Sequence, residues 1–307
     1  NAYVNKRWIE ANPLPAEFSR IGAFTLLGEK STYDVKALMD ELMAKPAASL
    51  SGDERRILDT YRTYLDTSAI EAAGLAPAQP WLARIKGAKT LDDLAMLWAE
   101  PGFASPVGGG VGVDAKQPDR HIASVGFGGL GMPDRDYYLD TSDKGKAIQA
   151  KYKEYLTFLL GEAGYADPAA MAGTVYAFED TIARTVAWDR TVRRNRDLTY
   201  NLLTADELSA ISGKVPVTAM LTAIGIEKSP GFVVSLMPPT AEEIAQFKLD
   251  EATRAKIGTG LPGMFALLGE TPVETLQAWM IKEFLSGNAA VLPARFDAAS
   301  FEFFGKT

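Results

Sequence analysis

The chain has 307 residues, of which 47% are apolar, so it can bury a substantial core. A formal net charge of −7 and a pI near 5.0 argue against nucleic-acid binding, since phosphates require a basic surface, and no apolar run predicts a membrane span. The complete lack of cysteine excludes disulfides, thiolate nucleophiles and thiolate metal sites, but it does not decide the compartment.

The opening segment predicts a helix that begins near Ser19. Such a helix would place Arg20 and Phe24 four residues apart on one face. The guanidinium could then bind a peptide carboxylate while the ring walls an apolar side-chain pocket. The alternative is a packed phenylalanine beside a solvated arginine, which is the commoner outcome for this spacing.

Helical signals continue through the first hundred residues. The segment 24–43 has a largely apolar stripe, and the sequence after Ser51 has the capping-box pattern, with a hydroxyl followed three residues later by Glu54. Another short helix is expected to begin at Thr90.

The helical period disappears between residues 101 and 133, where glycine is dense and strand-forming residues are scattered. One β-hairpin is predicted here, with its turn at residues 114–119. The glycine run at 108–112 lacks the Lys-Ser/Thr of a phosphate loop and does not begin a helix, so we do not interpret it as one.

Helices resume at Lys144, and Asp167-Pro168 caps a long helix that extends to Val186. The run that follows, residues 188–197, carries four arginines and two aspartates. We interpret it as a solvated or ion-paired face rather than a nucleic-acid site, because the chain as a whole is acidic.

The last third is also predicted to be mostly helical. Thr204 begins a capping box, residues 232–236 are either a strand or an extended connector, and residues 240–265 form helix with breaks. A final long helix is predicted to begin at Thr271-Pro272, with the hydroxyl as its cap, and to present a wide apolar face.

Four stretches in this order resemble the neprilysin family of zinc metallopeptidases. The sequences are YVNKRW (3–8) with SRIGAF (19–24), then GGLGMPDRDYY (128–138), RNRDLTYN (194–201) and FEFFGKT (301–307). Collinear matches along the whole chain are more specific than any single one. The absence of cysteine departs from the disulfide-rich animal members and suggests a bacterial homologue, which would be periplasmic or secreted.

The resemblance implies a mainly α fold: a multi-helix lobe of a two-lobed metallopeptidase with one small β-hairpin. Residues 1–307 would be the N-terminal half of such a peptidase and would form mostly the helical lobe that caps an enclosed chamber. The two ends, about 1–20 and 290–307, are expected to pack on the catalytic lobe.

The family's zinc site uses HExxH, which supplies two histidines from one helix. This chain has one histidine, His121, and no HExxH, so it cannot assemble that site alone. The resemblance therefore places the Zn²⁺ on a missing C-terminal half, expected as a second chain, without which this chain should be inactive. The aromatic stretch 301–307 would be a poor natural end, because such side chains normally pack against something.

The resemblance also assigns substrate-binding roles to Arg20 and Phe24. The arginine would bind the C-terminal side of a peptide substrate, and the phenylalanine would line the pocket for the residue just after the cleaved bond. Animal members have an acidic residue at Thr25 and a second arginine at Gly28. With one cation remaining, the preference for a free terminal carboxylate should weaken, which predicts broader endopeptidase activity.

Two other candidates are not assigned chemistry. His121 lies in the predicted hairpin and is expected to be a surface or packed residue, and the Asp134–Asp136 segment is expected to cap and ion-pair a turn. The alternative to a peptidase is a non-enzymatic helical peptide-binding or scaffold protein. A companion chain carrying HExxH would distinguish the two.

Overall fold

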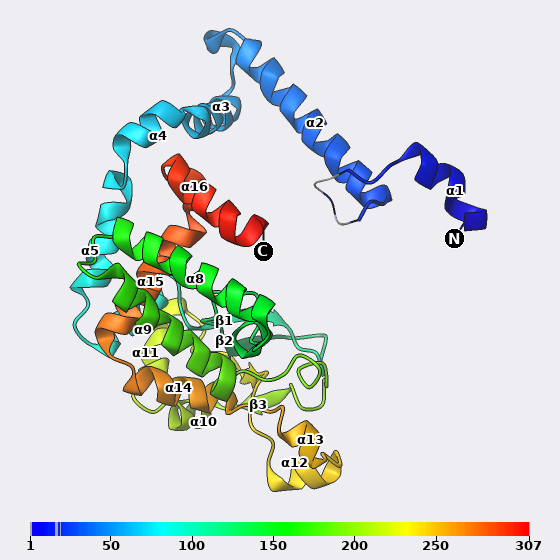
Figure 1. Ribbon diagram of the computed structural model, residues 1–307. Coiled ribbons are helices and arrows are strands. Elements are labelled where there is room, and N and C mark those ends of the chain that lie inside the picture. The colour runs from blue at the N-terminus through cyan, green and yellow to red at the C-terminus, as the bar shows by residue number, and fades with distance from the viewer. Residues whose placement is uncertain (1, 16–17, 19, 307) are drawn as a thin grey trace. The chain divides into compact units, whose positions relative to one another are not determined.

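The computed structural model describes residues 2–15, 18 and 20–306. The chain divides into two compact units, Asn1–Ser68 (unit 1) and Ala69–Thr307 (unit 2). Figure 1 shows the elements of both, and each unit is described on its own. No helix within the described ranges combines the length and the apolar character that a bilayer crossing requires.

Unit 1 is helical and loosely packed. Its helices are α1 (Ala2–Ala11), α2 (Ala23–Ala44) and α3 (Gly52–Leu65), with a short 3-10 turn at Ala47–Ser49. The predicted capping box is confirmed, because Ser51 Oγ accepts from Glu54 N and the Glu54 carboxylate accepts from Ser51 N. No described residue of α2 is buried, so its apolar stripe stays largely exposed although α2 contacts α3.

The predicted start of the second helix is wrong. Arg20 and Ile21 are not helical, and Gly22 is extended at φ −164° and ψ 177°, so α2 begins at Ala23. Glycine is a poor helix former because it has the most backbone freedom to lose. Ser19, where the helix was expected to begin, lies outside the described residues.

Unit 2 holds most of the helices, and α4 crosses the boundary between the units. Their bounds are α4 (Thr67–Ala73), α5 (Gln79–Gly87), α6 (Leu91–Trp98), α7 (Asp136–Leu139), α8 (Asp143–Glu162), α9 (Pro168–Thr181), α10 (Ala205–Ile211), α11 (Val217–Ile224), α12 (Ala241–Gln246), α13 (Glu251–Arg254), α14 (Gly260–Glu270), α15 (Val273–Gly287) and α16 (Ala294–Ser300). Ala76–Ala78 and Ala289–Val291 form 3-10 turns, and Ile182–Val186 and Phe301–Gly305 form π-helical turns.

The predicted hairpin is confirmed as β1 (Val107–Val113) and β2 (His121–Phe127), which pair antiparallel. Two further strands, β3 (Asn201–Leu203) and β4 (Phe232–Val234), extend it to a four-stranded sheet in the order β1-β2-β4-β3 within the described residues. Strand β4 pairs parallel with β2 and antiparallel with β3. The first three residues of the 232–236 run thus form a strand, whereas β3 was not predicted from the sequence.

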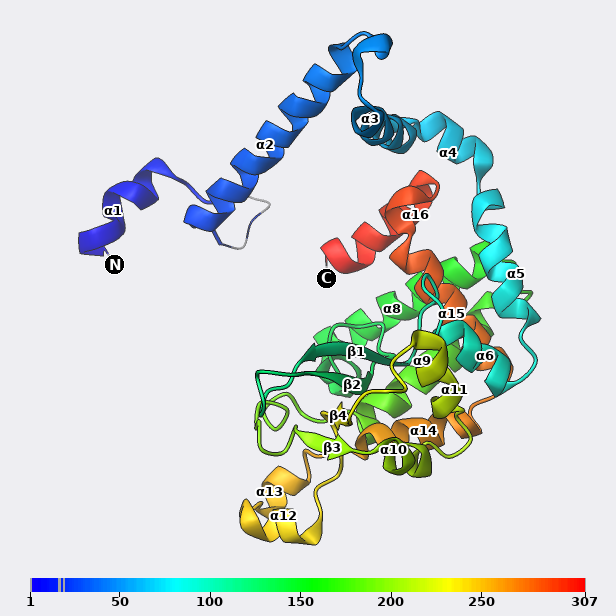
Figure 2. The ribbon, with the colours of Figure 1, turned by 180° about the vertical axis from the view of Figure 1, so that it is seen from behind.

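The core of unit 2 lies among α8, α9 and α15, and Figures 1 and 2 show the sheet on one side of this group. The predicted apolar face of the last long helix is confirmed, since Leu276, Met280 and Leu285 are fully buried. Its predicted cap is wrong. The residue at the cap position is Pro272, and the Thr271 hydroxyl instead donates to Leu267 O in α14.

Candidate functional site

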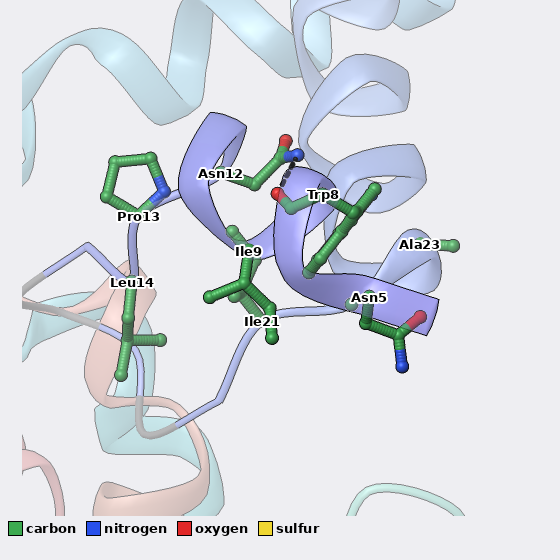
Figure 3. A pocket seen from close by; sticks show the side chains of 9 residues that line it. Asn5, Trp8, Ile9, Asn12, Pro13, Leu14, Ile21 and Ala23 are labelled. Carbon is green, nitrogen blue, oxygen red and sulfur yellow. Dashed lines mark hydrogen bonds between the residues drawn. The ribbon is translucent and has the colours of Figure 1, made fainter. Parts of the chain in front are cut away.

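The sequence neighbours of the peptide-site candidates Arg20 and Phe24, namely Ile21 and Ala23, line a surface groove in unit 1 (Figure 3). The groove has a volume of about 530 Å³ and runs between α1 and the chain that leads into α2. It is lined by Asn5, Trp8, Ile9, Asn12, Pro13, Leu14, Ile21, Gly22 and Ala23. Asn12 Nδ2 donates to Trp8 O over 2.8 Å and closes the end of α1.

Arg20 and Phe24 flank this lining in sequence but do not belong to it. Both are exposed, and the Phe24 side chain is 90% exposed in the first turn of α2. Because Arg20 precedes the helix, the predicted shared helical face does not exist. The two side chains instead come from different backbone segments on either side of Gly22, so the groove itself does not bring them together.

A second groove lies between α2 and α3 and has a volume of about 580 Å³. Its lining is mostly apolar and aromatic: Val35, Met39, Arg56, Ile57, Thr60, Tyr61 and Tyr64. Near it, Lys45 Nζ lies 2.9 Å from Glu54 Oε1. The hydrogen bonds from Lys45 and from Ser51 lower the pKa of Glu54 to about 2.

Zinc ligands are not found in the described part of this chain. No group of three or more His, Asp or Glu side chains there is placed to hold a metal ion. His121 is exposed at the first residue of β2, and its neighbours in the hairpin offer no second imidazole. The donor set of this chain therefore does not fit a catalytic zinc ion.

The aspartates of the GGLGMPDRDYY stretch form ion pairs, as predicted. Asp134 Oδ2 lies 2.6 Å from Arg193 and Asp136 Oδ2 lies 3.9 Å from Arg190, so two motifs far apart in sequence meet. This arrangement also confirms that the arginine run is an ion-paired face.

Sequence reasoning missed a buried polar cluster in unit 2. Lys282 Nζ (α15) lies 2.6 Å from Glu179 Oε1 (α9), and Glu179 Oε2 accepts from the hydroxyls of Tyr138 and Tyr152 over 2.7 and 2.8 Å. Lys282 also lies 2.7 Å from Glu283. The sequence signal for this cluster was a charged residue on the apolar face of a predicted helix: Glu179 in one helix and Lys282 in the other.

The pKa values in this cluster follow from burial and charge. Burial raises the pKa of Glu179, and the nearby Lys282 ammonium offsets only part of that effect. Burial lowers the pKa of Lys282, but attraction to Glu179 and Glu283 outweighs it and raises the pKa overall. Lys282 is therefore charged, and its side chain is only 3% exposed, so a structural role fits it best.

Comparisons with known proteins agree with the fold. The model of peptidase family M13 matches residues 1–307. The chain is 28% identical over 237 residues to endothelin-converting enzyme 1 of Cavia porcellus, covering 73% of this chain and 30% of that protein. It is 28% identical over 227 residues to neprilysin-3 of Drosophila melanogaster, covering 68% of this chain and 28% of that protein.

Solved structures of zinc metalloproteases also resemble this chain. The inhibitor complex of zinc metalloprotease Zmp1 from Mycobacterium tuberculosis superposes with a TM-score of 0.79 at 25% identity, over 99% of this chain and 44% of that one. PepO of Lactobacillus rhamnosis shares the fold, with a TM-score of 0.64 at 15% identity over 98% of this chain and 45% of that one. The chain thus spans less than half the length of these relatives. Since the family model covers every residue, the chain belongs to peptidase family M13 and corresponds to the N-terminal half of a neprilysin-like member.

Proposed function

We propose that the chain is the N-terminal portion of a zinc-dependent endopeptidase that hydrolyses peptides in an enclosed chamber. In this proposal it caps the chamber and contributes to the primed-side substrate pocket. The observation that carries the proposal is the family match over residues 1–307, in a chain that has a single histidine. The zinc ion and the HExxH glutamate then belong to the C-terminal half, expected as a second chain, and this chain alone is inactive.

Arg20 and Phe24 are the proposed substrate contacts. Their exposure supports this role, because both side chains are accessible and Arg20 forms no ion pair with the residues that the structure describes. The Arg20 guanidinium would bind a peptide carboxylate or carbonyl on the primed side, and the Phe24 ring would wall the adjacent side-chain pocket.

The exposed apolar side chains support the proposed docking of the two ends of the chain, about 1–20 and 290–307, on the catalytic lobe. In α1, Tyr3, Val4 and Ile9 are 99%, 79% and 47% exposed. In the C-terminal turn, Phe303 is buried against Tyr152 and Tyr155, whereas Phe301 and Phe304 are 60% and 46% exposed. Apolar faces of this kind usually pack against another surface.

Peptide hydrolysis by the full-length zinc-loaded enzyme tests the site. Arg20→Ala should raise KM for peptides with a free terminal carboxylate by roughly ten- to a hundredfold, since a charge-assisted hydrogen bond contributes about 1.5–3 kcal/mol. Phe24→Ala should raise KM for peptides with a large apolar residue after the cleaved bond. Arg62→Ala, an exposed arginine of α3, and Tyr33→Ala, on the opposite side of α2 from Phe24, are the matched controls.

Two results would contradict the proposal. If Arg20→Ala and Arg62→Ala change KM equally, Arg20 does not have the proposed substrate-binding role. A full-length protein without peptidase activity would favour the non-enzymatic alternative. Paired substrates with free and amidated C-termini test the endopeptidase prediction, which a strong preference for the free acid would contradict. The proposed location, periplasmic or secreted, is tested by fractionating the source cells.

A further inference from the structure

Strand β1 lies at the edge of the sheet, where one side of its backbone has no neighbouring strand among the residues that the structure describes. Within the described residues, β1 pairs with β2 and with no other strand, and Figure 2 shows it at the margin of the sheet. A free strand edge presents unpaired N–H and C=O groups, which form a template for another extended chain.

The hydrogen bonds at the two ends of the hairpin show which residues face outward. Gly128 N donates to Pro106 O over 2.9 Å, and Asp114 N donates to Arg120 O over 3.0 Å. In an antiparallel pair the inward-facing residues alternate, so the even-numbered residues of β1 bond to β2. The N–H and C=O groups of Gly109, Val111 and Val113 therefore face away from the sheet, and they make no hydrogen bond in the part of the chain that is described.

Strand β1 lacks the sequence features that usually prevent the free edge of a sheet from pairing with another chain. The seven residues of β1, VGGGVGV, contain no proline or charge, and they pair one to one with β2 without a bulge. Val111 and Val113 are each 60% exposed. A Cβ atom at Gly108, Gly110 or Gly112 would meet nothing within 4 Å, so one face of the strand is bare backbone.

The opposite face of β1 borders a small apolar recess. It is lined by Val107 and Gly109 of β1 and by Met220 and Ile224 of α11, among others, and its volume is about 20 Å³. A space of this size holds about one small group. Ile224 is 39% exposed beside it. A strand added to β1 would place every second side chain on this face, because side chains alternate along a strand.

We propose that β1 binds an extended peptide by strand addition, with Gly109, Val111 and Val113 supplying the backbone hydrogen bonds and the recess favouring a small apolar side chain.

A second copy of the chain is a poor candidate for the partner of this edge. A seven-residue strand is about 24 Å long, and its edge falls well short of the roughly 800 Å² per partner of a stable interface. The absence of charge on β1 matches an uncharged peptide segment. The proposal rests on the proposed function, in that the peptide is a substrate segment away from the cleaved bond.

The test uses the full-length zinc-loaded enzyme with two substrates that share one cleavage sequence. The short substrate contains that sequence only, and the long one adds a tail with valine and alanine at alternate positions. Val111→Pro removes an outward N–H without removing a bond to β2, and Val111→Ala, which keeps the N–H, is the matched control. We expect Val111→Pro to raise KM for the long substrate roughly three- to tenfold, while kcat and short-substrate kinetics stay unchanged.

Residue-resolved amide exchange on the unmodified enzyme gives a readout that needs no variant. Added tail peptide should slow exchange at Gly109, Val111 and Val113, whereas Gly108, Gly110 and Gly112 are already protected by β2. The proposal is overturned if Val111→Pro and Val111→Ala behave alike, or if the outward amides are protected before peptide is added, since the edge would then be covered by the enzyme's own chain. Failure to cleave the short substrate would instead refute the proposed function.

Discussion

Glu179 of α9 and Lys282 of α15 form an ion pair in the core of unit 2, with their side chains 0% and 3% exposed. Two ions removed from water are stable there only when nearly all of their hydrogen-bonding capacity is used. Tyr138, Tyr152 and Glu283 provide that capacity here. The pair therefore ties α15 to α9 and, through Tyr138, to the GGLGMPDRDYY stretch.

Replacement of one partner should be strongly destabilising. Lys282→Met leaves the Glu179 carboxylate buried without its counter-ion, and we expect a loss of about 3–5 kcal/mol in the free energy of unfolding. Urea unfolding followed by circular dichroism measures it, with Lys146→Met at an exposed site of α8 as the control. The double variant Glu179→Gln/Lys282→Met should recover much of the loss. Equal stability of Lys282→Met and Lys146→Met would mean that Glu179 is neutral in the folded protein.

Tyr138→Phe should lower the free energy of unfolding more than Tyr152→Phe does. The Tyr138 hydroxyl accepts from Gly131 N and Met132 N over 3.1 and 3.0 Å and donates to Glu179, so its loss leaves two backbone N–H groups unpaired. Each unsatisfied buried group costs about 1–3 kcal/mol. Tyr152 has no backbone donors to satisfy, and thermal unfolding of the two variants should separate them. The reverse order would indicate that the backbone at residues 131–132 can find other partners.

Gly131 should not tolerate a side chain. A Cβ atom there would lie 1.7 Å from the Tyr152 hydroxyl oxygen and 2.6 Å from Lys282 Nζ. Gly131→Ala should therefore destabilise the protein by about 1–3 kcal/mol through overpacking. Gly108→Ala, where the new methyl meets open space, is the control. Adding Tyr152→Phe to Gly131→Ala should relieve part of the clash, and an additive double variant would contradict this explanation.

Asp114 should make the hairpin sensitive to acid. Its side chain is buried at the turn, which raises its pKa, but hydrogen bonds from Lys116 N, the Arg120 guanidinium and the Tyr200 hydroxyl outweigh that and hold the pKa at about 2. A pKa below the unfolded value of about 3.9 means that the stabilisation is present above pH 4 and is lost as the pH falls toward 2.

Amide exchange in residues 107–127 between pH 5 and pH 2 measures this effect. Asp114→Asn should abolish the acid-induced loss of protection and leave the hairpin equally weakened throughout the range. Glu54 titrates in the same range but lies in unit 1, so Glu54→Gln should leave the hairpin profile unchanged. An unchanged profile in Asp114→Asn would show that another group controls the turn.

Local patterns were predictable because their partners lie within a few residues. The capping boxes predicted at Ser51 and Thr204 form as their spacing indicated, and the short helix expected to begin at Thr90 is capped by that residue. The hairpin also formed where the glycine-rich, strand-forming segment surrounds a polar turn. In each case the hydrogen bonds join neighbouring residues, so spacing alone determines them.

The candidate peptide site was only partly predictable. The sequence identified Arg20 and Phe24 through the family motif, but it could not show that the chain stays extended through Gly22 and that α2 begins at Ala23. Because Arg20 precedes the helix, the two side chains do not share the helical face that an unbroken helix would have given them. The capping preference of this segment was too weak to locate the helix start from sequence.

By itself, the sequence determined the helical composition, the hairpin and the family, because all of these depend on residue type and short-range order. The tertiary structure decided that Glu179 meets Lys282, that β3 and β4 complete the sheet, and that no other strand in the described part of the chain pairs with the outer edge of β1. These pairings join segments far apart in the chain. They depend on how whole elements pack, which no local spacing encodes.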